Sequence, residues 1–175
     1  IVGNCHRMPA SAFEKRLTTH QEITQHWINT IDTLNFLYPE LKFIFTVSPV
    51  RHLRDGMHEN QLSKSHLLLS IQSLIDMRPK CCFYFPAYEI FMDDLRDYRF
   101  YAGDMIHPSE EAVKHVWEIL QTSLIDDISL RAMQDIDGMV MQLEHRYRSH
   151  GEDAHFAAIE EKILERIRQV KTAKS

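Results

Sequence analysis

Strand-like apolar runs alternate with helical segments along this chain, and the alternation restricts the folds open to it. Residues 41–50 (LKFIFTVSPV) and 81–85 (CCFYF) are rich in aromatic and other apolar residues, and a proline lies in or directly after each run. Short continuous apolar runs are typical of strands buried on both faces of a parallel sheet. Ile1–Gly3 is a third, shorter run before a turn at Asn4. The sequence therefore predicts an α/β domain with parallel strands covered by helices.

The segments between these runs have the period of a helix. Thr19 and Glu22 form a capping-box pattern, and apolar residues then recur at spacings of four, four and three as far as Tyr38. The polar stretch at 51–61 predicts a loop, and residues 63–77 predict a second helix. A helix between consecutive strands is the usual connection in a parallel sheet.

The connection after the second run, residues 86–108, is long for a loop. We expect a helical turn within it near residues 90–95, and a helix at 110–120 for which Pro108 suits the first turn. The strands, helices and loops up to residue 122 are thus assigned to one domain, residues 1–122.

A helical hairpin is predicted for the rest of the chain, residues 123–175. Residues 126–148 and 152–173 are rich in charged and helix-forming residues, and Gly151 lies between them. Their apolar stripes would pack on each other, on another part of the protein, or on a second subunit in a homo-oligomer.

Composition limits the class of partner and the compartment. The chain has 175 residues and a formal net charge of −5, which argues against a nucleic-acid or anionic-membrane surface. No run approaches the roughly 18 apolar residues of a transmembrane helix. Two of the three cysteines, Cys81 and Cys82, are adjacent, so a disulfide framework is not expected and a reducing, cytoplasmic compartment is favoured. No glycine-rich phosphate loop is present, and no cofactor is predicted.

Asp104 and His107 are the strongest candidates for chemistry. They lie three residues apart, just before Pro108, so the carboxylate could orient one imidazole nitrogen and leave the other free as a general base. A turn with a polar cap would show the same pattern. Loops that follow parallel strands meet at the carboxyl edge of the sheet, so those beginning at Asn4 and Arg51 are expected to reach the same edge.

Other candidates have weaker patterns. The Asn4 amide could stabilise a developing oxyanion or only complete a turn. Arg51, His52 and His6 are candidates for substrate contacts, although Arg51 could equally pair with a neighbouring acid. His6, His52 and Asp104 could also be offered as metal ligands, but no H-E-x-x-H or C-x-x-C spacing supports a metal site, and none is predicted.

Five segments resemble the GSCFA family, a bacterial family of the SGNH/GDSL hydrolase-like superfamily. They are GNCH (residues 3–6), FTVSPVRHLRDG (45–56), Glu59-Asn60, Ser63-Lys64 and YFPAYEIFMDDLRDYRFYAGDMIHPS (84–109). The resemblance extends from residue 1 to about residue 120. It implies a flavodoxin-like three-layer α/β/α sandwich, which agrees with the strand and helix pattern.

The resemblance also implies a set of catalytic roles. The late D-x-x-H motif of the superfamily falls on Asp104 and His107, and its oxyanion asparagine corresponds to Asn4. The nucleophilic serine of the Gly-Ser-Cys-Phe-Ala motif has no counterpart here. We therefore expect that serine upstream of Ile1, in an N-terminal half of the same protein that would be a partner of this chain.

Three functions are compatible with these residues. The first is a serine esterase of the SGNH type acting on a small ester, such as an acylated carbohydrate, with this chain alone inactive. The second is a binding or scaffolding protein that keeps the fold without turnover. The third, a metal-dependent hydrolase using His6, His52 and Asp104, has the least support.

Overall fold

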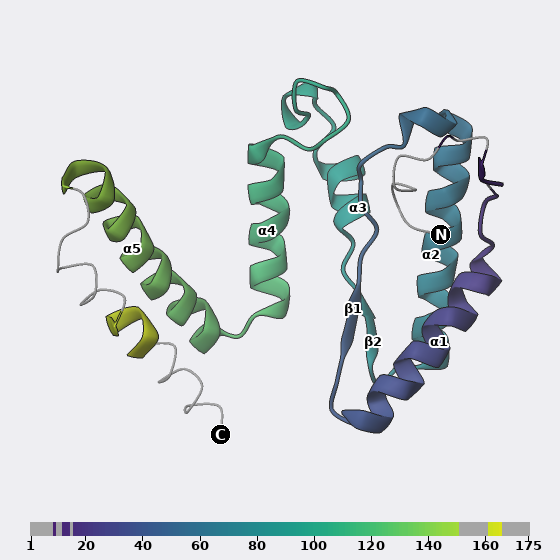
Figure 1. Ribbon diagram of the computed structural model, residues 1–175, viewed down its shortest axis with the longest axis horizontal. Helices are drawn as coiled ribbons and strands as arrows, with labels where there is room; N and C mark the ends of the chain where they lie inside the picture. Colours follow the sequence, from purple (N-terminus) through teal and green to yellow (C-terminus); the bar gives the residue numbers. More distant parts are fainter. Residues whose placement is uncertain (1–8, 10–11, 15, 151–160, 166–175) are drawn as a thin grey trace. The chain divides into compact units, whose positions relative to one another are not determined.

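The computed structural model describes residues 9, 12–14, 16–150 and 161–165 (Figure 1). The chain divides into two compact units, residues 1–116 and residues 117–175. The predicted strand at Ile1–Gly3 and the candidates Asn4 and His6 lie outside the described residues.

Helix α1 (His20–Leu37) begins at the predicted capping box. The Thr19 hydroxyl accepts a hydrogen bond from the amide of Glu22, and the Glu22 carboxylate accepts one from the amide of Thr19. This reciprocal pairing gives hydrogen-bond partners to the backbone amides of Thr19 and Glu22, which the start of a helix otherwise leaves unpaired. The helix is confirmed, but its inward face only in part: Ile31 of the predicted stripe is buried together with Ile28, whereas Trp27, which the spacing placed on that stripe, is 41% exposed.

Strands β1 (Phe43–Phe45) and β2 (Cys82–Tyr84) pair in parallel, as predicted. Both are shorter than the apolar runs that predicted them. In the first run Pro49 has no amide to donate, and residues 46–52 leave β1 to bond with the next helix instead. These two strands are the whole sheet within the described residues, so the observed fold class is α/β.

One face of the sheet is covered and the other is open. Ile44 and Phe83 are register partners, and they are 53% and 44% exposed. Their neighbours along the strands point to the opposite face, where Phe43 and Phe45 pack against buried residues of the core.

Helix α2 (Met57–Met77) connects the two strands and starts earlier than the sequence predicted. The stretch at 51–61 was expected to be a loop, but it contains a short 3-10 helix at Leu53–Asp55 and the first residues of α2. The prediction was wrong because the inward positions of this part of α2 are polar: Asn60 and Lys64 are buried there. An apolar periodicity cannot reveal such a helix.

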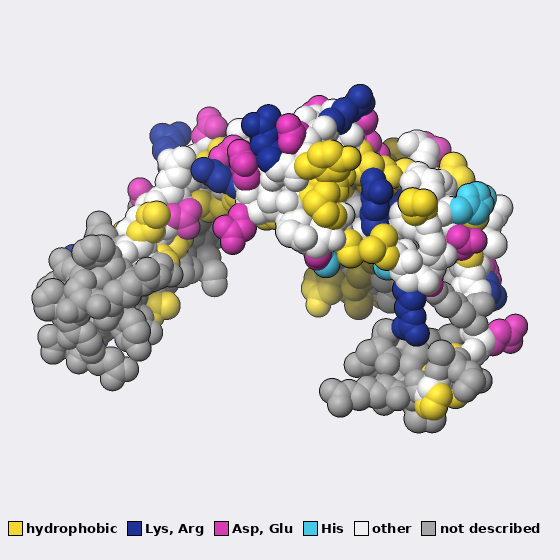
Figure 2. Space-filling view, turned by 90° about the horizontal axis from the view of Figure 1, so that it is seen from above, with side chains coloured by type: hydrophobic (Ala, Val, Ile, Leu, Met, Phe, Trp, Pro, Cys, Tyr) yellow, Lys and Arg dark blue, Asp and Glu magenta, His cyan; other side chains and the backbone are white. Residues whose placement is uncertain are grey.

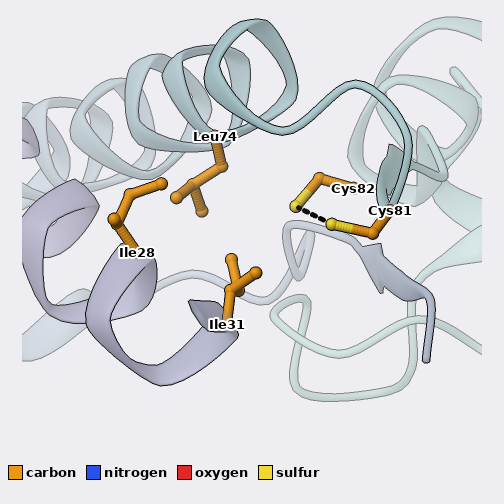
Figure 3. Close-up of a cluster of buried hydrophobic side chains, with 5 residues drawn as sticks. All are labelled: Ile28, Ile31, Leu74, Cys81 and Cys82. Atoms are coloured by element: carbon orange, nitrogen blue, oxygen red, sulfur yellow. Dashed lines mark hydrogen bonds between the residues drawn. The ribbon is translucent and has the colours of Figure 1, made fainter. Parts of the chain in front are cut away.

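The main core lies between α1, α2 and the start of β2 (Figure 3). Its buried members are Ile28, Ile31, Leu74, Cys81 and Cys82. The two cysteines are free thiols with their sulfur atoms 3.9 Å apart, in agreement with the expectation that they do not form a disulfide. Burial is the main cause that raises the pKa of Cys82 to about 11, so this thiol stays protonated and serves as core.

A second cluster supports the connection that follows β2. The helical segment α3 (Ala87–Glu89) continues into a π-helical turn at Ile90–Asp94, which confirms the helical turn predicted near 90–95. Phe91 and Leu95 then bury themselves against Ala112 of helix α4 (Glu110–Leu124).

The second unit contains helix α5 (Asp127–His150), and residues 161–165 are also helical. Most of the second predicted hairpin helix, residues 152–173, lies outside the described residues. The hairpin, its boundary at residue 123 and its role in an oligomer therefore remain predictions. Among the described helices, none has the length and apolar character needed to cross a membrane. Acidic and basic side chains are interspersed over the face shown in Figure 2.

Candidate active site

Residues 101–108, here called the Asp–His loop, are closed on themselves by backbone hydrogen bonds. Tyr101 and Pro108 face each other in an isolated antiparallel bridge. The amide of Ala102 donates to the carbonyl of His107 at 2.8 Å, and the amide of Ser109 donates to the carbonyl of Phe100 at 2.8 Å. The two ends of the loop are therefore fixed to each other, and the residues between them form a compact turn.

The side chains of Asp104 and His107 meet within this loop. His107 Nδ1 lies 2.6 Å from Asp104 Oδ2. The other oxygen, Oδ1, accepts hydrogen bonds from the amides of Ile106 at 2.9 Å and His107 at 3.0 Å. Both carboxylate oxygens are thus held by groups that lie within three residues of Asp104.

These bonds determine the charge and the tautomer. The backbone amide of His107, then its imidazole and the amide of Ile106, hold the pKa of Asp104 at about 2. The carboxylate is therefore ionised at neutral pH and can only accept hydrogen bonds. In the neutral imidazole Nδ1 must then carry the proton, which leaves the Nε2 lone pair free to take a proton from another group.

The pair is open to solvent. The side chains of His107 and Asp104 are 60% and 46% exposed. The orientation of Asp104 therefore comes from the amides of its own loop rather than from burial. A side chain as exposed as that of His107 can be reached by a substrate or by a nucleophile from elsewhere in the protein.

Met105 shows the backbone cost of this arrangement. Its φ is +60°, the left-handed region that few residues other than glycine adopt readily. Such strain persists where surrounding contacts fix the backbone, and it clusters at functional sites. Here the amide of Met105 donates to the carbonyl of Ala102 at 2.9 Å, inside the turn that brings Asp104 to His107.

A separate pocket gathers the two described candidates for substrate contact. Arg51 and His52 follow β1 and line a cavity of about 150 Å³. Its other walls come from the segment between β1 and α2, from the start of α2 and from the helical segment after β2: Pro49, Leu53, Met57, Asn60, Gln61, Tyr88 and Met92. His52 and Asn60 also border a wider cavity of about 650 Å³ next to the start of α1. In the part of the chain that the structure describes, no hydrogen bond or ion pair joins Arg51 or His52 to the Asp104–His107 pair.

The sequence did not single out Asn60 as a pocket residue. Its side-chain oxygen accepts a hydrogen bond from the amide of His52 at 2.9 Å, so it shapes the pocket as well as lining it. The available signal was two polar residues, Asn60 and Lys64, one helical turn apart in a segment that is otherwise helix-forming.

The described residues contain neither a nucleophile bonded to His107 nor a metal cluster. No described serine makes a hydrogen bond to His107, and no described group of three or more His, Cys, Asp or Glu side chains could hold a metal ion. Of the ligand set considered from the sequence, His6 lies outside the described residues.

The fold and the site define an α/β protein with an aspartate–histidine pair in a loop that follows the second parallel strand. The model of the GSCFA family matches residues 1–119, and the chain belongs to that family. No protein with a curated function and no solved structure is significantly similar to the chain.

Proposed function

We propose that this protein is a serine esterase of the SGNH type in which His107 is the general base and Asp104 orients it. The observation that carries the proposal is the 2.6 Å contact between His107 Nδ1 and Asp104 Oδ2, made by a carboxylate that two backbone amides also hold. Membership in the GSCFA family supports it, because this pair falls on the late D-x-x-H motif of the superfamily.

The mechanism would be acyl transfer to water. A serine hydroxyl attacks the ester carbonyl while His107 Nε2 takes its proton, and the imidazolium then gives that proton to the leaving alkoxide. A water molecule then attacks the acyl-enzyme while His107 takes its proton, and the imidazolium returns that proton to the serine as the acid leaves. We place the serine upstream of Ile1, in the motif that gives the family its name, and Asn4 beside it as an oxyanion donor.

The remaining parts of the proposal concern the substrate and the fold. Arg51, His52 and His6 would contact a small ester, such as an acylated carbohydrate, and the pocket beside Arg51 and His52 supports such a role. The fold would be a flavodoxin-like three-layer sandwich. The open sheet face at Ile44 and Phe83 supports this, because parallel sheets are normally covered on both faces.

The test compares His107→Ala with His26→Ala in the protein together with any sequence that precedes Ile1. His26 is an exposed histidine of α1, so its variant controls for loss of a surface imidazole. Hydrolysis of short-chain p-nitrophenyl esters and acetylated sugars should fall at least about 10³-fold in His107→Ala, with an unchanged Tm, and should persist in His26→Ala.

The alternative is a binding or scaffolding protein that keeps the fold without turnover. The observation that favours it is the lack, among the described residues, of a serine bonded to the exposed His107. Wild-type protein that hydrolyses none of these esters and takes up no fluorophosphonate on serine would support the alternative and exclude the esterase.

A further inference from the structure

Helix α2 directs two buried polar side chains toward the segment that follows β1, residues 46–52, here called the β1 loop. Asn60 is 8% exposed and Lys64 is 3% exposed. They are four residues apart and so lie on the same face of the helix, one turn from each other. Polar side chains this deeply buried are uncommon unless a specific partner holds them.

Both partners are backbone groups of the β1 loop. Lys64 Nζ donates a hydrogen bond to the carbonyl of Ser48 at 2.5 Å, and Asn60 Oδ1 accepts one from the amide of His52 at 2.9 Å. Within the loop, the Ser48 hydroxyl accepts a hydrogen bond from the amide of Val50. The loop is therefore attached to α2 at two points, Ser48 before Arg51 and His52 directly after it. The first point is held by the ammonium of Lys64 and the second by the side-chain amide of Asn60.

Lys64 is a costly way to stabilise a core. Among the described residues it has no carboxylate partner, and burial lowers the pKa of its ammonium. An apolar side chain of similar volume is often as stabilising as a buried charge, or more so. The interaction that an apolar residue could not replace is the hydrogen bond to Ser48, which fixes the course of the β1 loop.

We propose that Lys64 and Asn60 are positioning residues that hold the β1 loop so that Arg51 and His52 line the pocket. Lys64 is not a wall of that pocket, so it would act only through the loop. The proposal rests on the proposed function in one respect, which is that it assigns this pocket to the ester substrate.

The first experiment compares Lys64→Met with Lys42→Met in the full protein. Lys42 is a matched control, because its Nζ also donates to a backbone carbonyl, that of Lys80 at 3.0 Å, but it is exposed and precedes β1. Trypsin cleavage after the exposed Arg51, followed by mass spectrometry, reports on the loop. We expect cleavage about tenfold faster in Lys64→Met, the effect of losing one charge-assisted hydrogen bond, and unchanged in Lys42→Met.

The kinetic readout separates positioning from general stability. In Lys64→Met the KM for the ester should rise several-fold while kcat stays within about twofold, because the loop contacts substrate and the Asp–His loop is intact. A folded Lys64→Met protein that is cleaved at the wild-type rate and keeps the wild-type KM would overturn the proposal. If the wild type turns over no ester, the esterase fails, and the cleavage rate still decides the positioning role.

A second pair of variants applies if Lys64→Met does not fold. Asn60→Asp keeps an acceptor oxygen for the amide of His52, whereas Asn60→Leu removes it at similar volume. Faster cleavage after Arg51 in Asn60→Leu, with near wild-type cleavage in Asn60→Asp, is the expected result. Equal cleavage in the two variants would contradict the proposal.

Discussion

The Asp–His loop and the β1 loop both come after strands of the same sheet, yet they are fixed by different means. In the Asp–His loop the Asp104 carboxylate, the amides that bond to it and the His107 imidazole lie within three residues of each other, and the pair is exposed. The β1 loop contributes only backbone groups, and the side chains that hold it are buried on α2.

The difference separates two kinds of preorganisation. A loop that holds its own aspartate–histidine pair needs little from the rest of the protein, so under the proposed function changes to the pair should affect chemistry more than stability. A loop held by a helix depends on the packing of that helix, so it should respond to changes far from the pocket. The predictions below test this distinction.

The largest expected effect is that of Asp104→Asn. The asparagine side chain keeps an oxygen that accepts from the backbone amides of Ile106 and His107. Its NH₂ group, however, cannot accept a hydrogen bond from a protonated Nδ1, so His107 would be held in the wrong tautomer. We expect kcat for ester hydrolysis to fall about 10²- to 10⁴-fold, with a Tm close to wild type. Asp97→Asn is the control, because Asp97 also accepts a hydrogen bond from a nearby amide, that of Arg99. Retained turnover in Asp104→Asn would show that the pair is a structural cap.

Substitutions in the two apolar clusters should affect the two loops differently, because each cluster supports a different loop. Phe91→Ala is expected to cost about 3–5 kcal/mol and Leu74→Ala about 2–5 kcal/mol, because both side chains are almost fully buried. Phe91 makes an edge-to-face contact with Tyr101 at the base of the Asp–His loop, with ring centroids 4.9 Å apart. Leu74 lies in the core that supports α2.

Hydrogen exchange in the native state measures this separation. Phe91→Ala should speed exchange at the amide of His107 more than at that of His52, and Leu74→Ala should do the reverse. Leu69→Ala, which truncates an exposed leucine of α2, is the control for a small effect at both amides. Equal acceleration at both amides in both variants would mean that the loops open only with the whole domain.

The sequence predicted the Asp–His loop better than the β1 loop for a physical reason. Asp104 and His107 interact over three residues, so their spacing in the chain already limits their distance in space. Asn60 and Lys64 act on residues that precede them by eight and by sixteen positions, across a turn that only the folded chain defines. Their polarity also hid the first residues of α2.

The predicted strands show a similar limit. Parallel pairing of residues 43–45 with 82–84 followed from the alternation of elements. The ends of the strands did not, because residues 46–50 are as apolar as a strand but bond to α2 instead. The three-layer sandwich depends on elements beyond the described sheet and stays a prediction.

A smaller effect is expected from the backbone at two described residues with positive φ, Met105 in the Asp–His loop and Gly56 between the β1 loop and α2. Gly56, the residue directly before α2, has φ +89°, and an added Cβ would lie 3.2 Å from Glu59 Oε2. Gly56→Ala should therefore destabilise the protein by roughly 1 kcal/mol or more. Met105→Gly relieves the strain at φ +60° and should change stability by between about 0 and +1 kcal/mol, because glycine also gains freedom in the unfolded chain.

Gly103→Ala is the control for both variants. Its added Cβ would meet nothing within 4 Å, and its φ is not in the left-handed region, so the change should be neutral or slightly stabilising. Chemical denaturation of the three variants gives the comparison. A loss of stability in Met105→Gly would show that the Met105 side chain contributes more than its backbone strain costs.

The smallest expected effect is a pH dependence confined to the Asp–His loop. The folded-state pKa of Asp104, about 2, lies below the ordinary value of 3.8, so its contribution to loop stability is present above about pH 4 and is lost as the pH falls toward 2. The amide chemical shifts of Ile106 and His107 should follow that titration in NMR spectra, while the amide of His52, held by the uncharged Asn60, should not. A titration midpoint near 4 at the amides of Ile106 and His107 would mean that these amides do not stabilise the carboxylate, and the contrast between the two loops would then rest on burial alone.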